Sequence, residues 1–134
     1  MSDCIFCKIV DGEIPCYNIF ENDEFFAFLD IHPLNPGHVQ VIPKKHCRWV
    51  WDYENPQGYF TCCQKIAKAL QKAFETEWIV SLIIGEAVPH SHIWLVPRMA
   101  NDGHGGSINL NHHVELSSEQ MKTIQKRIVD VLSG

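Results

Sequence analysis

Hydrophobic and polar residues recur along this chain with two different periods, which predict different elements. Between residues 57 and 74, apolar side chains return every three or four positions and lysines and glutamines lie between them, a spacing typical of an amphipathic helix. A second helix is predicted after Ser117, because Gln120 follows at the capping-box spacing and an apolar stripe comes next. The predicted apolar faces are Phe60, Cys63, Ile66, Ala67, Leu70 and Phe74 in the first helix and Met121, Ile124, Ile128 and Leu132 in the second.

Shorter apolar runs bounded by turn residues predict about five strands. They cover residues 17–21, 24–30, 38–43, 78–84 and 88–98, and the fourth run is so apolar that we expect a buried strand. Residues 4–10 predict a helical turn, and the Gly-rich segment 101–106 a mobile loop. Strands in hairpin order, with one long helix between them and one helix at the end, indicate an α+β fold with a mainly antiparallel sheet. The length predicts a single domain over residues 1–134.

Composition narrows the function classes. The net charge is −5 with only 11 basic residues, which argues against a broad nucleic-acid surface. No run approaches the roughly 20 apolar residues of a membrane span, and the first residues lack a signal-peptide pattern, so we expect a cytoplasmic protein without membrane contact. In a reducing cytosol the six cysteines are expected to be free thiols or metal ligands.

The segment 88–98 holds the most informative pattern. His90, His92 and Trp94 are two residues apart, so an extended strand would place all three on one face. Two surface histidines on an edge strand would produce the same pattern as a pair of reactive imidazoles. His92 is the candidate nucleophile, because a neutral imidazole can attack phosphorus when its other nitrogen donates to a backbone carbonyl. The alternative for His92 is a hydrogen-bonded core histidine.

A Cys-x-x-Cys pair at Cys4 and Cys7 is a weak motif by itself, since it fits both redox chemistry and metal binding. Joined by two histidines, the pair would form the tetrahedral Cys2His2 set that zinc prefers. The available histidines are His46, just after a predicted strand, and His90. His104, His112 and His113 lie in polar surroundings, and we expect them to be solvated loop residues.

Taken together, these segments resemble the histidine triad (HIT) family of nucleotide hydrolases and transferases. The resemblance is carried, in family order, by CIFCKIVDGEIP at 4–15, AFLDI at 27–31, PGH at 36–38, VIPKKH at 41–46 and VPHSH at 88–92. It implies a homodimer with the HIT-like fold. It also implies cleavage of nucleoside phosphoramidates, dinucleoside polyphosphates or related substrates, with a purine nucleotide as the substrate or ligand.

The resemblance assigns roles to individual residues. It implies that His92 attacks the α-phosphate and forms a covalent nucleotidyl-histidine, and that Asp30 binds the ribose hydroxyls. The implied supporting residues are His38, His90 and the residue at position 94, and the implied apolar surroundings of the base are Phe6, Phe28 and Ile31. For members with the N-terminal cysteine pair, the resemblance also implies a structural zinc ion, held here by Cys4, Cys7, His46 and His90.

Three features depart from the family pattern. The third triad position is Trp94, which offers one N–H donor and no acceptor. The loop 84–88 is short and lacks the Asn and Ser that contact phosphate in many relatives, and Glu86 adds a negative charge there. Two hypotheses follow: a HIT-type hydrolase or nucleotidyl transferase acting through His92, or a catalytically impaired HIT-fold module that binds nucleotides or other proteins.

Overall fold

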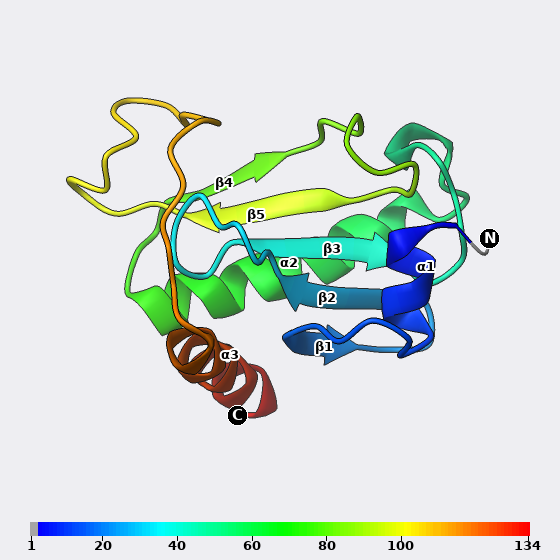
Figure 1. The fold of residues 1–134 in the computed structure, drawn as a ribbon, viewed down its shortest axis with the longest axis horizontal. Helices are drawn as coiled ribbons and strands as arrows, with labels where there is room; N and C mark the ends of the chain where they lie inside the picture. Colours follow the sequence, from blue (N-terminus) through cyan, green and yellow to red (C-terminus); the bar gives the residue numbers. More distant parts are fainter. Residues whose placement is uncertain (1–2) are drawn as a thin grey trace.

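The computed structural model describes residues 3–134, and five of its segments form one sheet (Figure 1). The strands are β1 (Asn18–Glu21), β2 (Phe25–Leu29), β3 (Val39–Pro43), β4 (Ile79–Leu82) and β5 (Ile93–Pro97). They lie in the order β1-β2-β3-β5-β4, and every neighbouring pair is antiparallel. The helices are α1 (Ile5–Val10), α2 (Pro56–Phe74) and α3 (Ser118–Ser133), with a short 3-10 helix, η1 (Val50–Asp52). The predicted α+β fold is confirmed.

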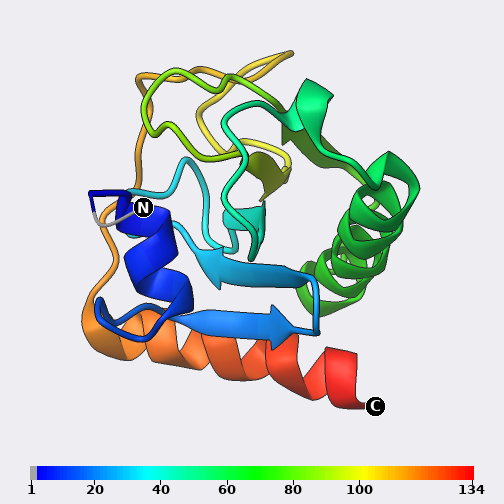
Figure 2. The same cartoon turned by 90° about the vertical axis from the view of Figure 1, so that its right-hand side faces the viewer.

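The helices cover the sheet unequally (Figures 1 and 2). Helix α2 packs across one face, α3 runs beside β1 and contacts α2, and α1 lies on the opposite face. Alternate side chains of β2 point to opposite faces of the sheet. Phe25, Ala27 and Leu29 belong to the large core under α2 and α3. Phe26 and Phe28 belong to a smaller cluster under α1. Because both faces of β2 are buried, this strand connects the two apolar clusters.

Both long helices form where the hydrophobic pattern predicts them. Helix α2 begins at Pro56, after the N-cap Asn55, whose side chain accepts from the Gly58 N–H. Its predicted apolar face is wrong at one position, because Phe60 is 69% exposed. Tyr59 is buried in its place and donates its hydroxyl to the Val41 carbonyl at 2.7 Å. Within residues 3–134, none of the helices has the length and hydropathy that a membrane span requires.

Helix α3 begins with the predicted capping box. The Ser117 hydroxyl accepts from the Gln120 backbone N–H at 3.1 Å, and the Gln120 side chain accepts from the Ser117 N–H at 2.8 Å. Of the predicted stripe, Met121, Ile124 and Ile128 are buried, and they join the core beneath the sheet.

Two strand predictions need correction. The run 78–84 was expected to be a buried strand, yet β4 is an edge strand whose side chains are half-buried or exposed. Its apolar composition therefore reflects an open surface rather than a covered one. The strand predicted over residues 88–98 is also shorter than expected. Strand β5 begins at Ile93, so His90 and His92 lie in the irregular segment just before it.

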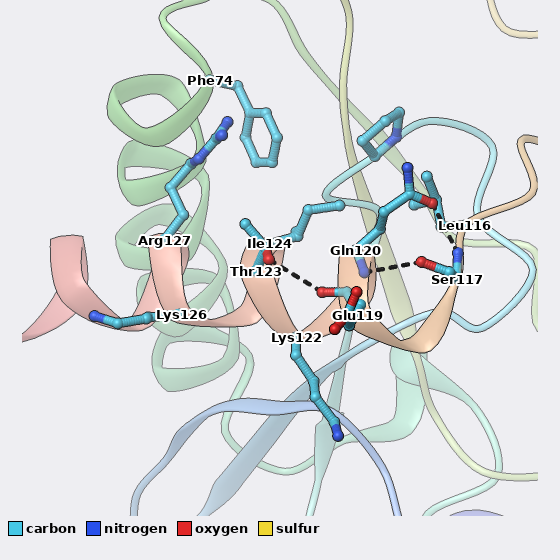
Figure 3. A pocket seen from close by; sticks show the side chains of 11 residues that line it. Phe74, Leu116, Ser117, Glu119, Gln120, Lys122, Thr123, Ile124, Lys126 and Arg127 are labelled. Carbon is cyan, nitrogen blue, oxygen red and sulfur yellow. Dashed lines mark hydrogen bonds between the residues drawn. The ribbon is translucent and has the colours of Figure 1, made fainter.

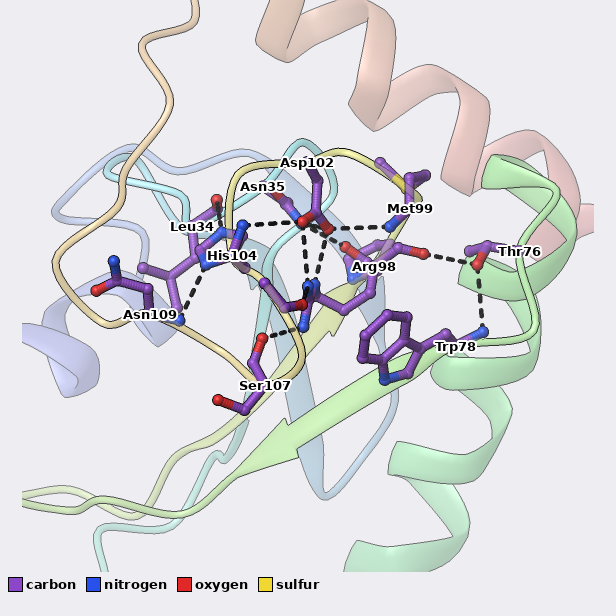
Figure 4. A network of polar contacts seen from close by, with 12 residues as sticks. Leu34, Asn35, Thr76, Trp78, Arg98, Met99, Asp102, His104, Ser107 and Asn109 are labelled. Atoms are coloured by element: carbon purple, nitrogen blue, oxygen red, sulfur yellow. Dashed lines mark hydrogen bonds and ion pairs between the residues drawn. The ribbon is translucent and has the colours of Figure 1, made fainter.

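The Gly-rich segment after β5, which was expected to be mobile, is organised around a buried ion pair (Figure 4). The Arg98 side chain is 1% exposed and donates from Nε to Asp102 Oδ2 at 2.7 Å. The guanidinium also donates to the carbonyls of Gly105 and Ser107, and Asn35 donates to Asp102 at 2.9 Å. The hydrogen bonds from Arg98 hold the pKa of Asp102 well below its usual range. A charge buried this deeply is tolerated because each guanidinium nitrogen has a hydrogen-bond partner.

His104 in the same segment is buried, not solvated as predicted. Its Nε2 lies 2.7 Å from the Leu34 carbonyl, and its Nδ1 accepts from the Asn109 N–H at 3.0 Å (Figure 4). His112 is half-buried with its ring 4.7 Å from that of His104, whereas His113 is exposed. The polar neighbours of His104 in sequence gave no sign of this burial, because its Nε2 partner, the Leu34 carbonyl, comes from a distant segment.

Candidate active site and metal centre

Helix α1 places the cysteine pair beside the end of β3. Cys4 is the N-cap of the helix, and its Sγ accepts from the Cys7 N–H at 3.4 Å. Phe6 and Ile9 fasten the helix to Phe28 and the rest of the smaller cluster. This packing aims both sulfurs at the same point.

Four potential ligand atoms meet at that point. The Sγ atoms of Cys4 and Cys7 and the Nδ1 atoms of His46 and His90 all lie within 4.8 Å of one another. The Cys4–His90 and Cys7–His46 contacts are both 3.3 Å, and the Cys7–His90 contact is 3.5 Å. A tetrahedral zinc ion with bonds of about 2.0 to 2.3 Å holds its ligand atoms about 3.3 to 3.8 Å apart. The donor set and its spacing therefore fit zinc.

The protonation states also fit a cation. His90 donates from Nε2 to the Pro43 carbonyl at 2.8 Å, so its Nδ1 carries no hydrogen and faces the sulfurs. Burial and the neighbouring Cys4 raise the pKa of Cys7 to about 11. The Cys7 thiol would therefore lose its proton near neutral pH only beside a positive charge.

His92 is held as a nucleophilic imidazole would have to be. It is 3% exposed, and its Nδ1 lies 2.7 Å from the backbone carbonyl of His90. A carbonyl can only accept, so Nδ1 carries the hydrogen and Nε2 is free of one. Burial lowers the pKa of His92, and the positive charge of Arg48 lowers it further. The ring is consequently neutral at pH 7, with a lone pair on Nε2.

Asp30, Gln40 and Trp94 form a row on the α1 side of the sheet. In the strand register Gln40 lies opposite Phe28 on one side and Trp94 on the other. Trp94 Nε1 donates to Gln40 Oε1 at 3.3 Å, and Gln40 Nε2 donates to Asp30 Oδ2 at 3.2 Å. Asp30 Oδ1 accepts from the His32 N–H at 2.7 Å. The third triad position thus contacts the aspartate through a glutamine.

His38 lies under this row. Its ring is 4.7 Å from that of Trp94, and its Nδ1 accepts from the Leu34 N–H at 3.1 Å. Its Nε2 is 3.7 Å from Asp30 Oδ2, too long for a hydrogen bond. Among residues 3–134 it is the one buried side-chain nitrogen or oxygen without a hydrogen-bond partner. Burial lowers the pKa of His38 to about 4, although Asp30 opposes the shift.

The three residues expected around the base divide into two groups. Phe6 and Phe28 are buried and pack edge to face at 5.5 Å, and the Phe6 ring also contacts His92 edge to face at 5.4 Å. Ile31 is 67% exposed. The phenylalanines therefore form the floor beneath the histidines, and Ile31 lies at the surface next to Asp30.

Sequence reasoning missed Gln40 and Arg48. Arg48 follows the end of β3 and donates from Nη1 to the Gly85 carbonyl at 2.7 Å, with its guanidinium 3.7 Å above the Trp49 ring. A Cβ on Gly85 would lie 2.9 Å from Trp49, so the loop before His90 is closely fitted to this pair. Gln40 could have been found from strand alternation, which places it on the same face as position 38.

The hollows of the surface are only partly related to these residues. A groove of about 860 Å³ lies between the end of α2 and α3, and Phe74, Leu116 and Arg127 are among its lining residues (Figure 3). It contains none of the candidate site residues. A second hollow, of about 760 Å³, is lined by Ile31, His32 and residues 113–116. It includes the neighbour of Asp30 in sequence and therefore lies next to the candidate site.

Comparison with known proteins places these features in a family. A model described as the HIT domain matches residues 11–101, which is more than half of the 134 residues. The chain therefore belongs to the HIT domain family.

Three relatives illustrate the similarity. The adenosine 5'-monophosphoramidase HNT1 of Saccharomyces cerevisiae is 33% identical over 136 residues, covering 98% of this chain and 84% of that protein. A solved HIT-like protein of Bartonella henselae involved in cell-cycle regulation has a TM-score of 0.84 and 33% identity, covering 98% of this chain and 97% of that one. A zinc-bound histidine triad family protein of Mycobacterium smegmatis has a TM-score of 0.80 and 26% identity, covering 98% and 94%.

The lowered pKa of His38 predicts a pH-dependent stability. An unfolded histidine binds a proton below about pH 6.5, whereas folded His38 does so only below about 4. The contribution of neutral His38 to the free energy of unfolding is therefore fully present above pH 6.5 and is lost as the pH falls toward 4. Between pH 7 and pH 5, we expect the wild type to lose about 2 kcal/mol more unfolding free energy in urea than His38→Asn. Asn keeps an acceptor for Leu34, and equal losses in the two proteins would contradict this assignment.

Proposed function

We propose that the chain is a HIT-type nucleotide hydrolase or nucleotidyl transferase that acts through a covalent nucleotidyl-His92 intermediate. The observation that carries this proposal is the 2.7 Å contact between His92 Nδ1 and the His90 carbonyl, which leaves Nε2 free to attack. The similarity to an adenosine 5'-monophosphoramidase supports the substrate class. That class comprises nucleoside phosphoramidates and dinucleoside polyphosphates.

In the proposed reaction, the Nε2 lone pair of His92 forms a bond to the α-phosphorus of the nucleotide. The bond from phosphorus to the leaving nitrogen or oxygen breaks, and the leaving group takes the electron pair and a proton from solvent. Water then attacks the same phosphorus, the P–Nε2 bond breaks, and a nucleoside monophosphate is released with the imidazole restored. The charge of Arg48, which is close enough to lower the pKa of His92, would favour the negatively charged phosphate.

The proposed roles of the other site residues rest on where each side chain lies relative to His92 and Asp30. We propose that Asp30 binds the ribose hydroxyls, because its carboxylate is anchored by Gln40 and the His32 backbone beside the surface hollow. Phe6, Phe28 and Ile31 would provide the apolar surroundings of a purine. His38, His90 and Trp94 would act as supporting residues, since each touches a neighbour of the reacting groups.

A second candidate function is a nucleotide-binding or interaction module that has lost catalysis. The observation in its favour is Trp94, whose indole packs against His38 and donates to Gln40 at the position where the family pattern has its third histidine. On this alternative, nucleotides would bind without turnover.

Removal of the nucleophile separates the two functions. We expect His92→Ala to lower turnover of an adenosine phosphoramidate at least about 10⁴-fold, as loss of a nucleophile does. It should also abolish the nucleotidyl adduct seen as added mass on the intact protein. His112→Ala, in the loop after β5, is the control and should keep both. Unchanged turnover in His92→Ala would exclude this mechanism, and AMP binding without turnover by the wild type would favour the binding module.

We propose that Cys4, Cys7, His46 and His90 hold a structural zinc ion. Zinc bound there would join the N-terminal helix to the segment that carries His92 and would not take part in the reaction. The fit of the four atoms to tetrahedral spacing supports this role.

Metal analysis tests the zinc site. We expect one zinc ion per wild-type chain and a much lower content in Cys7→Ser, because the alcohol is a poor ligand. A chelator should lower the thermal midpoint of the wild type more than that of Cys7→Ser. Cys16→Ser is the matched control, since Cys16 lies outside the four-ligand cluster. Equal zinc contents in Cys7→Ser and Cys16→Ser would exclude this ligand set.

We further propose a homodimer formed along β4. Strand β4 is at the sheet edge and pairs with β5 alone among the described strands. Apolar side chains crowd this edge: Phe60 is 69% exposed, Trp78 43% and Ile83 40%. Phe60, Ile79 and Ile83 also line a hollow of about 280 Å³ between α2 and β4. A second copy would pair the open edge and cover this apolar surface.

Light scattering tests the dimer. We expect the wild type to have twice the chain mass of 15.4 kDa, and Ile83→Lys to shift the protein toward the monomer by burying a charge in the interface. Leu110→Lys is the control, because Leu110 has a similar exposure of 46% but lies in the loop before α3. A wild type that is monomeric at all concentrations would contradict the proposal.

A further inference from the structure

The third triad position raises a question that the proposed chemistry does not answer: what the indole of Trp94 does. Its Nε1 does not approach His92 within hydrogen-bond distance; it donates to Gln40 Oε1 at 3.3 Å. Gln40 in turn donates to Asp30. Trp94 is therefore connected to the proposed ribose end of the site rather than to the phosphate end.

The donor-only chemistry of the indole fixes the direction of this chain of hydrogen bonds. An amide group can present either its oxygen or its NH2 to a neighbour, and the two orientations occupy the same volume. Because Trp94 can only donate, the oxygen of Gln40 must face the indole. The NH2 group must then face Asp30, and it lies 3.2 Å from Oδ2. A flipped amide would set its oxygen against the carboxylate and leave the indole N–H facing another donor.

His38 adds a second donor on the same side of Asp30. Its Nδ1 accepts from the Leu34 N–H, so the neutral ring carries its hydrogen on Nε2. This N–H points toward Asp30 Oδ2 across 3.7 Å and has no closer partner. Oδ2 therefore faces donors on its inner side, while Oδ1 is held by the His32 N–H at 2.7 Å. The carboxylate is fixed in orientation by these donors, and the Asp30 side chain keeps 13% of its surface exposed, where a ligand can reach it.

We propose that Trp94 and Gln40 are positioning residues that align Asp30 to accept two hydrogen bonds from the vicinal 2'- and 3'-hydroxyls of a ribonucleotide, and so determine selectivity against 2'-deoxynucleotides. The proposal rests on the proposed nucleotide-binding function and deepens it. A carboxylate fixed by its neighbours cannot turn to compensate for a missing hydroxyl. A 2'-deoxynucleotide therefore leaves one charged acceptor desolvated and unpaired, which is costly.

The test is the ratio of dissociation constants for 2'-deoxy-AMP and AMP, measured by calorimetry. We expect the wild type to bind AMP at least about tenfold more tightly than 2'-deoxy-AMP, the value of one hydrogen bond to a charged group. Gln40→Met removes the amide at similar volume and should reduce the ratio to about threefold or less. Trp94→Phe keeps an aromatic ring but frees the amide to flip, so it should reduce the ratio in the same direction.

A purely structural role would weaken both nucleotides equally. The proposal instead requires the loss to be confined to AMP, with 2'-deoxy-AMP affinity changed by less than about twofold. Gln57→Met is the matched control, because Gln57 is exposed at the start of α2, and it should leave the ratio unchanged.

The outcomes distinguish the positioning role from the function on which it rests. If the wild type is selective and Asp30→Asn removes the selectivity while Gln40→Met and Trp94→Phe keep it, the positioning role is overturned and ribonucleotide binding stands. If the wild type binds neither nucleotide, the proposed function fails and the positioning role fails with it. Equal weakening of both nucleotides in Gln40→Met also overturns the positioning role.

Discussion

His90 is the residue on which the candidate site depends, because three contacts meet at it, two of them from distant parts of the chain. Its Nε2 donates to Pro43 at the end of β3, its Nδ1 faces the thiols of Cys4 and Cys7, and its backbone carbonyl accepts from His92. His90 is fully buried, so water cannot replace any of these partners. The ring orientation of His90 therefore determines which ligand atom is offered to a metal, and its backbone carbonyl determines the tautomer of the candidate nucleophile.

The two faces of the sheet differ in composition: one carries the large apolar core, and the other carries the candidate site. The face under α2 and α3 is apolar, with residues such as Leu29 and Val41 in one continuous core. The opposite face has a small apolar floor at Phe6 and Phe28, and polar groups surround it. Because β2 is buried on both sides, it joins the two regions rigidly. Polar residues can thus occupy the second face without weakening the core that holds the strands together.

Trp94 gives the candidate site a hydrogen-bond donor at a position where a histidine could also accept. A histidine at that position could accept or donate, whereas an indole only donates and occupies more volume. The polar contact of Trp94 is made to Gln40, so the proposed ribose side is organised by a fixed chain of donors. The proposed phosphate side would then depend on the neutral ring of His92 and on the nearby charge of Arg48. Positioning and electrostatics would have to supply what a third imidazole supplies elsewhere in the family.

The sequence by itself determined the elements, because hydrophobic period, caps and turns are properties of neighbouring residues. It also indicated, through family order, the four residues that the structure brings together as a candidate metal site. Tertiary structure decided which face of α2 is buried, with Tyr59 in place of Phe60. It also decided that His104 is buried, that Arg98 organises a Gly-rich loop, and that Gln40 connects two site residues. These contacts are made by side chains with partners outside the regular elements or in other segments, and periodicity contains no information about such contacts.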